Sequence, residues 1–319
     1  MTPRPERWSA GRWPRLARQI GALWLASSCV LLPAQAAFQC PEPPPLDAVV
    51  ADPATPHARG LLWKIARAGR PDSFLYGTVH LADPAIAKPS PAVLAALGQA
   101  RIFGLEVLFD EATLGRVAGS MRAAPPGNLG SAASGAMLRE VEKRLAAYGV
   151  DADSARRLKP WAAWTTLGLP PSQATAGEAL DLRLLAQARQ AGLEVFGLET
   201  LEEQVAVFDA MPLPDQLALL QDILCFADAQ QAELAATIAA WQREDLAWLL
   251  AQGRQQASPA VQALMKRLLE DRNVILAERL LPRLQQGGVF AAVGAAHLPG
   301  SDGVLARLAR AGFAVSRVQ

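Results

Sequence analysis

The stretch DSFLYGTVHL, from Asp72 to Leu81, joins an apolar strand pattern to a histidine. Its apolar run stops at Gly77 and is followed by His80, in a chain with only 3 histidines. A second stretch, VFAAVGAAHL from Val289 to Leu298, repeats the order of apolar run, glycine, two residues and histidine. Two strands that both end in Gly-x-x-His indicate a sheet with functional groups at its strand ends.

The segments around these two stretches predict a mixed sheet. The turn-rich segment AGRPD joins the apolar runs at 60–69 and 73–81, which is typical of a β-hairpin. Helical patterns separate the further strands, which are predicted at 100–108, 193–200, 287–298 and 313–319. This order indicates the α/β (α+β) class, a mixed β-sheet that starts with a β-hairpin and is flanked by helices. The helices at about 111–285 are expected to form a large insertion or lid.

The N-terminus has the pattern of a secretory signal. Five arginines precede an apolar run of about 13 residues, Ile20–Leu32, and Ala34-Gln35-Ala36 forms a cleavage site. The run is shorter than the roughly 20 residues that a membrane span needs. We therefore expect a signal peptide at 1–36, a proline-rich arm at 37–60 and a domain at 61–319. A periplasmic or secreted location follows, with a lipoprotein or an uncleaved anchor as the lesser alternative.

The charge balance and the cysteine content limit the classes of partner and site that the chain can have. Without residues 1–36, 26 basic and 29 acidic residues remain, a net charge of −3. This balance argues against a nucleic-acid partner, and no later segment is apolar enough to span a membrane. Cys40 and Cys225 remain in the exported chain and lack metal-site spacing. They are expected either to form a disulfide or to stay unpaired.

Four polar residues break the apolar pattern of the predicted strands. These residues are His80, Glu106, Glu199 and His297. Sites in such sheets gather at the carboxyl ends of strands, so these side chains converge if those ends share one edge. Two imidazoles and one carboxylate suit a divalent metal ion with open positions. A second carboxylate then serves as a general base or orients a histidine, and without metal a His–Glu pair remains an acid–base couple.

Two predicted helices add charged residues. Arg272 lies on the apolar face of the segment that begins at Ser258, where a buried guanidinium needs carboxylate or carbonyl partners. Glu106 and Glu199 are candidates for that role, and the alternative is that Arg272 reaches solvent at the edge of the face. Asp181 lies on the apolar face of ALDLRLL, with an exposed carboxylate as the alternative.

In this order, the motifs resemble those of the TraB/GumN family, which includes the Tiki proteins. The matching segments, between about 61 and 319, are LLWKI, FLYGTVHL, GLEVL, KPW, LDLRLL, EVFGLETLEEQ, DRN and FAAVGAAHLPGSDGVLARL. The resemblance implies a fold related to the erythromycin-esterase/ChaN-like group. Animal Tiki members are metal-dependent proteases, and the family's other members are associated with peptide pheromones or exopolysaccharide clusters.

The resemblance also implies roles for individual residues. His80, His297 and Glu106 are expected to bind a divalent ion such as Mn²⁺, Co²⁺ or Zn²⁺. Catalytic roles are expected for Glu106, Glu199 and Arg272. Substrate-binding roles are expected for Arg272, Asn273 and Asp181.

The leading hypothesis is an exported metal-dependent hydrolase that acts on peptide bonds. One alternative is a non-enzymatic protein that sequesters a peptide or another small ligand. Another is a metal-free, esterase-like enzyme that uses His80 or His297 as its base. The residues leave open the substrate, the metal, which glutamate is the ligand and which the base, and the oligomeric state.

Overall fold

The computed structural model describes residues 38–42, 49–81, 86, 88–108, 111–171, 179–254 and 259–318. All of these residues belong to the compact unit Ala37–Gln319. The predicted signal peptide, 1–36, and part of the predicted arm, 37–60, lie outside the described residues. Within the described ranges, no helix has both the length and the apolar character needed to cross a membrane.

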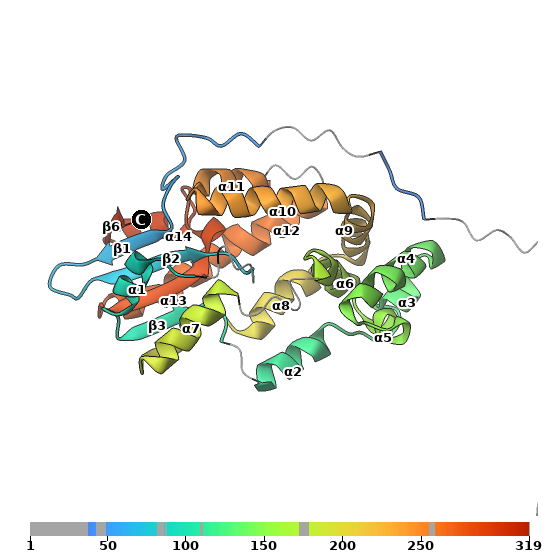
Figure 1. The fold of residues 1–319 in the computed structure, drawn as a ribbon, viewed down its shortest axis with the longest axis horizontal. Coiled ribbons are helices and arrows are strands. Elements are labelled where there is room, and N and C mark those ends of the chain that lie inside the picture. Colours follow the sequence, from blue (N-terminus) through green and yellow to red (C-terminus); the bar gives the residue numbers. More distant parts are fainter. Residues whose placement is uncertain are drawn as a thin grey trace, which may run out of the picture. The chain divides into compact units, whose positions relative to one another are not determined.

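A six-stranded mixed sheet organises the fold, in the order β4-β3-β5-β2-β1-β6 (Figure 1). Strand β1 pairs antiparallel with both β2 and β6, while β2, β5, β3 and β4 run parallel to one another. This arrangement confirms the prediction of a mixed sheet that starts with a hairpin. The bounds are β1 (Leu62–Ala66), β2 (Ser73–Thr78), β3 (Ile102–Leu105), β4 (Glu194–Gly197), β5 (Val289–Gly294) and β6 (Ala314–Arg317).

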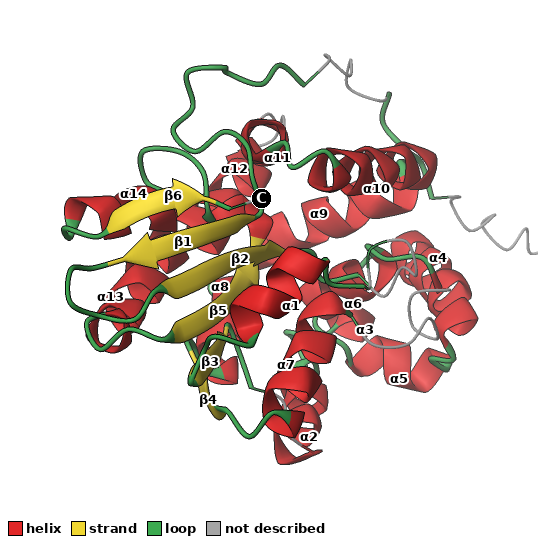
Figure 2. Ribbon diagram, turned by 60° about the vertical axis from the view of Figure 1, so that its left-hand side comes forward, coloured by secondary structure: helices red, strands yellow, loops and turns green. Residues whose placement is uncertain are grey.

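Helices cover both faces of this sheet, as the apolar character of its inner strands requires. Every residue of β2 is buried, and so is most of β5, which is typical of parallel strands covered on both sides. Figure 2 shows α1 and α7 on one face and α13 and α14 on the other. The bounds are α1 (Pro91–Leu97), α7 (Leu180–Gln190), α13 (Arg272–Leu284) and α14 (Val304–Arg310).

Most of the remaining helices form an insertion with a hydrophobic core of its own. That core includes Leu129, Val141, Leu145 and Leu220. The remaining helices are α2 (Glu111–Ser120), α3 (Leu129–Ala132), α4 (Gly135–Leu145), α5 (Ala152–Arg157), α6 (Pro160–Leu167), α8 (Leu201–Asp209), α9 (Leu213–Cys225), α10 (Ala227–Gln242), α11 (Leu246–Arg254) and α12 (Pro259–Met265). Of these, α10 and α11 bury their side chains in the core around the sheet instead. Short helical turns are η1 (Ala146–Tyr148), the π-helical η3 (Lys266–Asp271) and η4 (Ala295–His297).

The range 111–285, predicted as a lid, is not one block. Leu184 of α7 and Leu276 of α13 are buried in the core around the sheet, and β4 belongs to the sheet itself. Helix α10 also contacts the sheet, because the indole Nε1 of Trp241 donates a 3.0 Å hydrogen bond to the carbonyl of Gly77. Helix α10 is therefore anchored on the strand that carries the first Gly-x-x-His motif.

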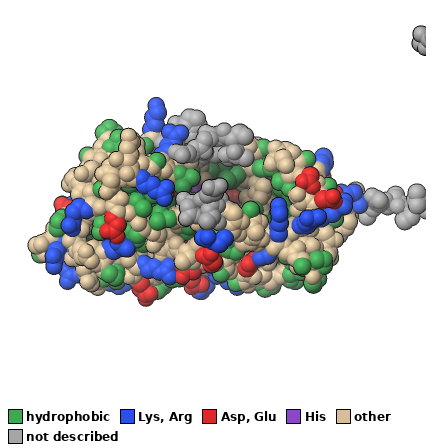
Figure 3. Space-filling view, turned by 90° about the horizontal axis from the view of Figure 1, so that it is seen from below, with side chains coloured by type: hydrophobic (Ala, Val, Ile, Leu, Met, Phe, Trp, Pro, Cys, Tyr) green, Lys and Arg blue, Asp and Glu red, His purple; other side chains and the backbone are tan. Residues whose placement is uncertain are grey.

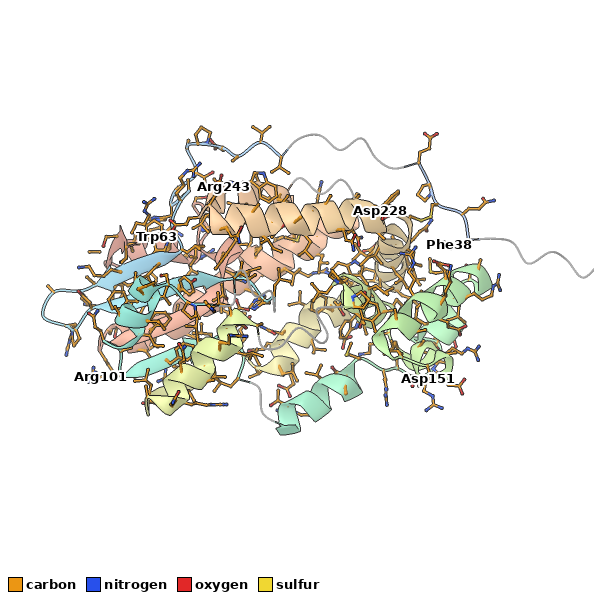
Figure 4. All side chains as sticks on the ribbon, viewed as in Figure 1. Phe38, Trp63, Arg101, Asp151, Asp228 and Arg243 are labelled. Carbon is orange, nitrogen blue, oxygen red and sulfur yellow. A yellow bond between two sulfur atoms is a disulfide. The ribbon has the colours of Figure 1, made fainter. Side chains whose placement is uncertain are left out.

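A disulfide joins the N-terminal arm to the insertion. Cys40 is bonded to Cys225 at the end of α9, across 185 positions of sequence. Phe38, labelled in Figure 4, packs against the core of the insertion. Together these contacts hold the start of the described chain against the helical insertion.

The glycine of the first motif lets the second motif pack against it. A Cβ atom at Gly77 would lie 2.8 Å from Cδ1 of Leu298 and 3.0 Å from Cα of Ala295. We expect Gly77→Ala to destabilise the fold by about 1–3 kcal/mol, because the backbone around Ala295 must shift to accommodate it. Urea unfolding measures this loss. The control is Gly119→Ala in α2, where a Cβ meets nothing within 4 Å; equal midpoints for the two variants would contradict the packing argument.

Candidate active site

The structure brings the two histidines and the two glutamates together at one edge of the sheet. His80, Glu106, Glu199 and His297 follow the carboxyl ends of β2, β3, β4 and β5, which run parallel. His80 Nε2 lies 3.9 Å from Glu106 Oε2, and His297 Nε2 lies 3.7 Å from Glu106 Oε1. Glu106 thus lies between the two imidazoles.

Arg272, at the start of α13, holds both glutamates. Its Nη2 donates to Glu106 Oε2 at 2.7 Å and to Glu199 Oε2 at 2.6 Å. Its Nε donates to both oxygens of Glu199 at 3.0 Å, and its Nη1 donates to the carbonyl of Leu268 at 3.3 Å. The guanidinium therefore uses most of its donors inside the protein, and burial makes these charge-assisted bonds stronger than exposed ones.

One participant, Gln204, was missed by the sequence analysis. Its Nε2 donates to Glu106 Oε2 at 3.4 Å and to Glu199 Oε2 at 3.3 Å. A signal was available, because Thr200 and Glu203 form a capping box that starts α8 directly after β4. A helix fixed at that point carries Gln204 in its first turns, next to the strand ends.

Asp181 orients His80. Its Oδ2 lies 3.1 Å from His80 Nδ1, and its side chain, in the first turn of α7, is only 9% exposed. The carboxylate holds the proton on Nδ1, which leaves the lone pair of neutral His80 on Nε2, the atom nearest Glu106. Asp181 Oδ1 is buried and has no hydrogen-bond partner among the described residues.

Asn273 plays the same part for His297. Its Nδ2 donates to the carbonyl of Asp302 at 3.1 Å, so its Oδ1 faces His297 Nδ1 at 2.7 Å. An acceptor at this position requires the proton on Nδ1 of neutral His297 and leaves the lone pair on Nε2. Both imidazoles therefore present a basic nitrogen toward Glu106.

The second motif's glycine keeps the space between these groups open. A Cβ atom at Gly294 would lie 3.4 Å from Glu106 Oε1, 3.4 Å from His297 Cδ2 and 3.5 Å from His80 Nε2. The backbone N–H of Gly294 donates to Glu106 Oε1 at 2.6 Å. The residue thus fixes the carboxylate and leaves room in front of it.

The carboxyl group of Glu106 is held in its ionised form. Burial alone raises its pKa, but the charges of His297, His80 and Arg272 and the N–H of Gly294 outweigh burial and lower the pKa to about 2. Burial also lowers the pKa of Arg272, but its bonds to the two glutamates prevail and raise it.

The two histidines differ in their surroundings. Burial lowers the pKa of His297 to about 4, against the opposing charge of Glu106. Burial of His80 also lowers its pKa, but its hydrogen bond to Asp181 and the charges of Glu106 and Asp181 have the larger combined effect and raise it. Because 55% of the His80 side chain is exposed, water screens these charges and moderates the upward shift of its pKa.

Comparison with protein-family models supports the family suggested by these motifs. The model of the TraB/PrgY/gumN family matches residues 61–317, most of the chain. The chain belongs to the TraB/PrgY/gumN family. No curated protein and no solved structure gave a significant match.

In this TraB/PrgY/gumN family member, the polar cluster opens onto a cavity of about 400 Å³. His80, Glu106, Asp181, Gln204 and Arg272 are the polar residues of its lining. Asn273 does not reach this cavity and instead lines a smaller one, of about 250 Å³, on the other side of η3. The structure therefore separates Arg272 and Asn273, which were predicted together as substrate-binding residues.

Proposed function

We propose that the chain is an exported metal-dependent hydrolase that cuts peptide bonds, with His80, His297 and Glu106 as metal ligands. Peptide bonds are the substrate class that the resemblance to Tiki proteins implies. The observation that supports a bound metal ion is the net negative charge of the buried cluster. Support for the ligands comes from the geometry around Glu106.

The buried charges are unbalanced. Glu106 and Glu199 bond to the guanidinium of Arg272, Asp181 bonds to His80, and these four charged side chains are buried. With both imidazoles in the neutral form that binds metal, these side chains carry three negative charges and one positive charge, a net charge of −2. Without metal, the raised pKa of His80 favours its protonated form, which leaves a net charge of −1. A buried excess of charge is costly unless it is compensated, and a divalent cation compensates it fully.

The donor atoms suit such an ion. Two imidazole nitrogens and a carboxylate form a set found in catalytic zinc sites and accepted by related metals. Metal–donor bonds of about 2.1 Å at a tetrahedral angle place two donors roughly 3.4 Å apart. His80 Nε2 lies 3.9 Å from Oε2 of Glu106 and His297 Nε2 lies 3.7 Å from Oε1, so each imidazole is near this spacing from a different oxygen of the carboxylate.

The described residues contain no cluster of three or more His, Cys, Asp or Glu side chains already at metal-binding spacing. The proposal therefore includes a closing movement of His80, whose side chain is 55% exposed and so has space to move. His297 and Glu106 are almost completely buried and provide the fixed part of the site.

The protein's own residues have defined tasks in this proposal. A bound divalent ion supplies Lewis acidity toward a carbonyl oxygen and toward water. Asp181 and Asn273 keep the two imidazoles in the required tautomer. Arg272 and Gln204 fix the carboxylate of Glu106, while Glu199 neutralises Arg272. Glu199 is thus a positioning residue and not the general base.

Metal content and cleavage test the proposal together. After dialysis against Mn²⁺, Co²⁺ or Zn²⁺, we expect about one ion per chain and cleavage of a peptide mixture, detected by mass spectrometry. His80→Ala and His297→Ala should each lose both properties, because each removes one of three ligands.

The third histidine provides a matched control. His57 lies in the arm against Trp63, with a positive φ of 56°, a conformation that asparagine tolerates. His57→Asn should therefore keep the metal and the activity. If His80→Ala and His297→Ala bind as much metal as His57→Asn, the ligand assignment is wrong.

The hydrogen bond between His80 and Asp181 favours a second candidate, a metal-free hydrolase in which His80 is the general base. A histidine oriented by a buried carboxylate is the arrangement that such a base needs. Turnover that resists chelators and is lost in His80→Ala would favour this candidate. Peptide that is bound but left intact, with or without metal, would instead favour a sequestering protein.

The proposed location is the periplasm or the exterior of the cell. It rests on the signal pattern at residues 1–36 and is supported by the Cys40–Cys225 disulfide, because such bonds persist in oxidising compartments. The proposed partner is a peptide or small molecule and not a nucleic acid. Acidic and basic side chains are intermingled on the face drawn in Figure 3, which fits that choice.

A further inference from the structure

The lining of the cavity beside Glu106 is of two chemical kinds. One part is the polar cluster described above. The other part is apolar and consists of Leu105, Val107, Ala179, Leu182, Val207, Phe208 and Leu268. A ligand that fills the cavity therefore meets both polar groups and hydrocarbon.

This division follows from helical spacing. Val207 and Phe208 lie three and four residues after Gln204 in α8, on the same face of the helix. Leu268 lies four residues before Arg272. Each of these two helical segments thus points a polar group and an apolar group into the cavity, about one turn apart.

The apolar part of the lining is partly open to water. Leu182, Val207, Phe208 and Leu268 are all only half-buried. In the described part of the chain, Leu182 belongs to neither hydrophobic core, whereas the other three pack against the core of the insertion. When a ligand covers exposed apolar surface in a concave site, the free energy of the complex is lowered.

We infer that this cavity is a specificity pocket for a single large apolar side chain, such as leucine, methionine or phenylalanine, of a bound peptide. The peptide backbone then lies against His80 and Glu106, where the polar groups are. A volume of about 400 Å³ is at the lower end of the range for ligand sites and suits one or two residues. This inference rests on the proposed function, because it assumes a peptide ligand.

A peptide series with one variable residue tests the inference. The probes are capped, Gly/Ser-rich decapeptides with Leu, Phe, Asp or Lys at the central position. Binding is measured by calorimetry on the full chain, and cleavage is measured separately by mass spectrometry with added Mn²⁺ or Zn²⁺. We expect the Leu and Phe peptides to bind at least roughly 10-fold more tightly than the Asp and Lys peptides.

Charge substitutions at Leu182 sharpen the test. Leu182→Arg should weaken binding of the Leu peptide about 10-fold and make the Asp peptide the preferred one. Leu182→Asp should instead favour the Lys peptide, so two independent variants report on the same position. The matched control is Leu94→Arg in α1, a leucine that is 43% exposed and lies outside the cavity lining; it should keep the original preference.

The outcomes separate this inference from the proposed function. A preference for Leu and Phe that reverses in the Leu182 variants, without any cleavage, supports the pocket and overturns the hydrolase. Cleavage of all four peptides at equal rates, unchanged in Leu182→Arg and Leu182→Asp, overturns the pocket and leaves the hydrolase standing. Failure of every peptide to bind overturns the pocket as well.

Discussion

Gly294→Ala is expected to abolish metal binding while the protein stays folded. The added methyl group would lie 3.4–3.5 Å from Glu106, His297 and His80, in ordinary contact with all three. The backbone at Gly294 has φ −54° and ψ 133°, which alanine adopts without strain. The substitution therefore fills the space in front of Glu106 without disturbing the strand.

We expect metal affinity to fall at least about 100-fold, since the methyl group prevents the three donors from closing on one ion. Titration calorimetry measures the affinity, and urea unfolding confirms that stability is kept. Gly119→Ala, in the open part of α2, is the control for adding a methyl group. Undiminished binding in Gly294→Ala would show that any ion lies elsewhere.

Arg272→Met is expected to cause the largest loss of stability of any substitution considered. It leaves Glu106 and Glu199 buried without their positive partner, and a broken buried ion pair costs about 3–5 kcal/mol. Methionine has a similar length and no charge, so lost packing contributes little. The loss is measured as a lower midpoint of urea unfolding, while the slope of the unfolding free energy against urea concentration stays unchanged.

The same helix offers a matched control. Arg279 forms a two-bond pair with Glu203, but these side chains are 40% and 36% exposed. Arg279→Met should therefore cost less than about 1 kcal/mol. Adding Glu199→Gln to Arg272→Met should recover part of the loss, because one uncompensated charge disappears. Equal losses of stability in the two arginine variants would mean that leaving Glu106 and Glu199 unpaired in the buried cluster has no extra cost.

The sequence was sufficient to predict the sheet and the edge where the polar residues meet. Gly-x-x-His and Gly-Leu-Glu mark the ends of apolar runs, and parallel strands bring their carboxyl ends to one edge. The inward position of Arg272 was also predictable, because helical spacing identifies a face and a buried guanidinium needs carboxylates.

Other features depend on tertiary contacts that no local pattern encodes. Leu268 lies four residues before Arg272, a spacing that predicts the same buried face for both, but the structure buries Leu269 and leaves Leu268 half-buried on the cavity. The reason is the π-helical turn η3, which inserts one residue and shifts the phase of the face. Likewise, helical spacing gives a direction for Asn273 but not its partner, because His297 comes from a distant strand end.

The junction between η3 and α13 has one more consequence. Two consecutive residues there, Arg272 and Asn273, hold Glu106 from one side and His297 from the other. The two groups therefore share a single backbone support and cannot be adjusted independently. Substitutions at these neighbouring positions should have effects that do not add, so natural variation in this family is expected to change the pair together.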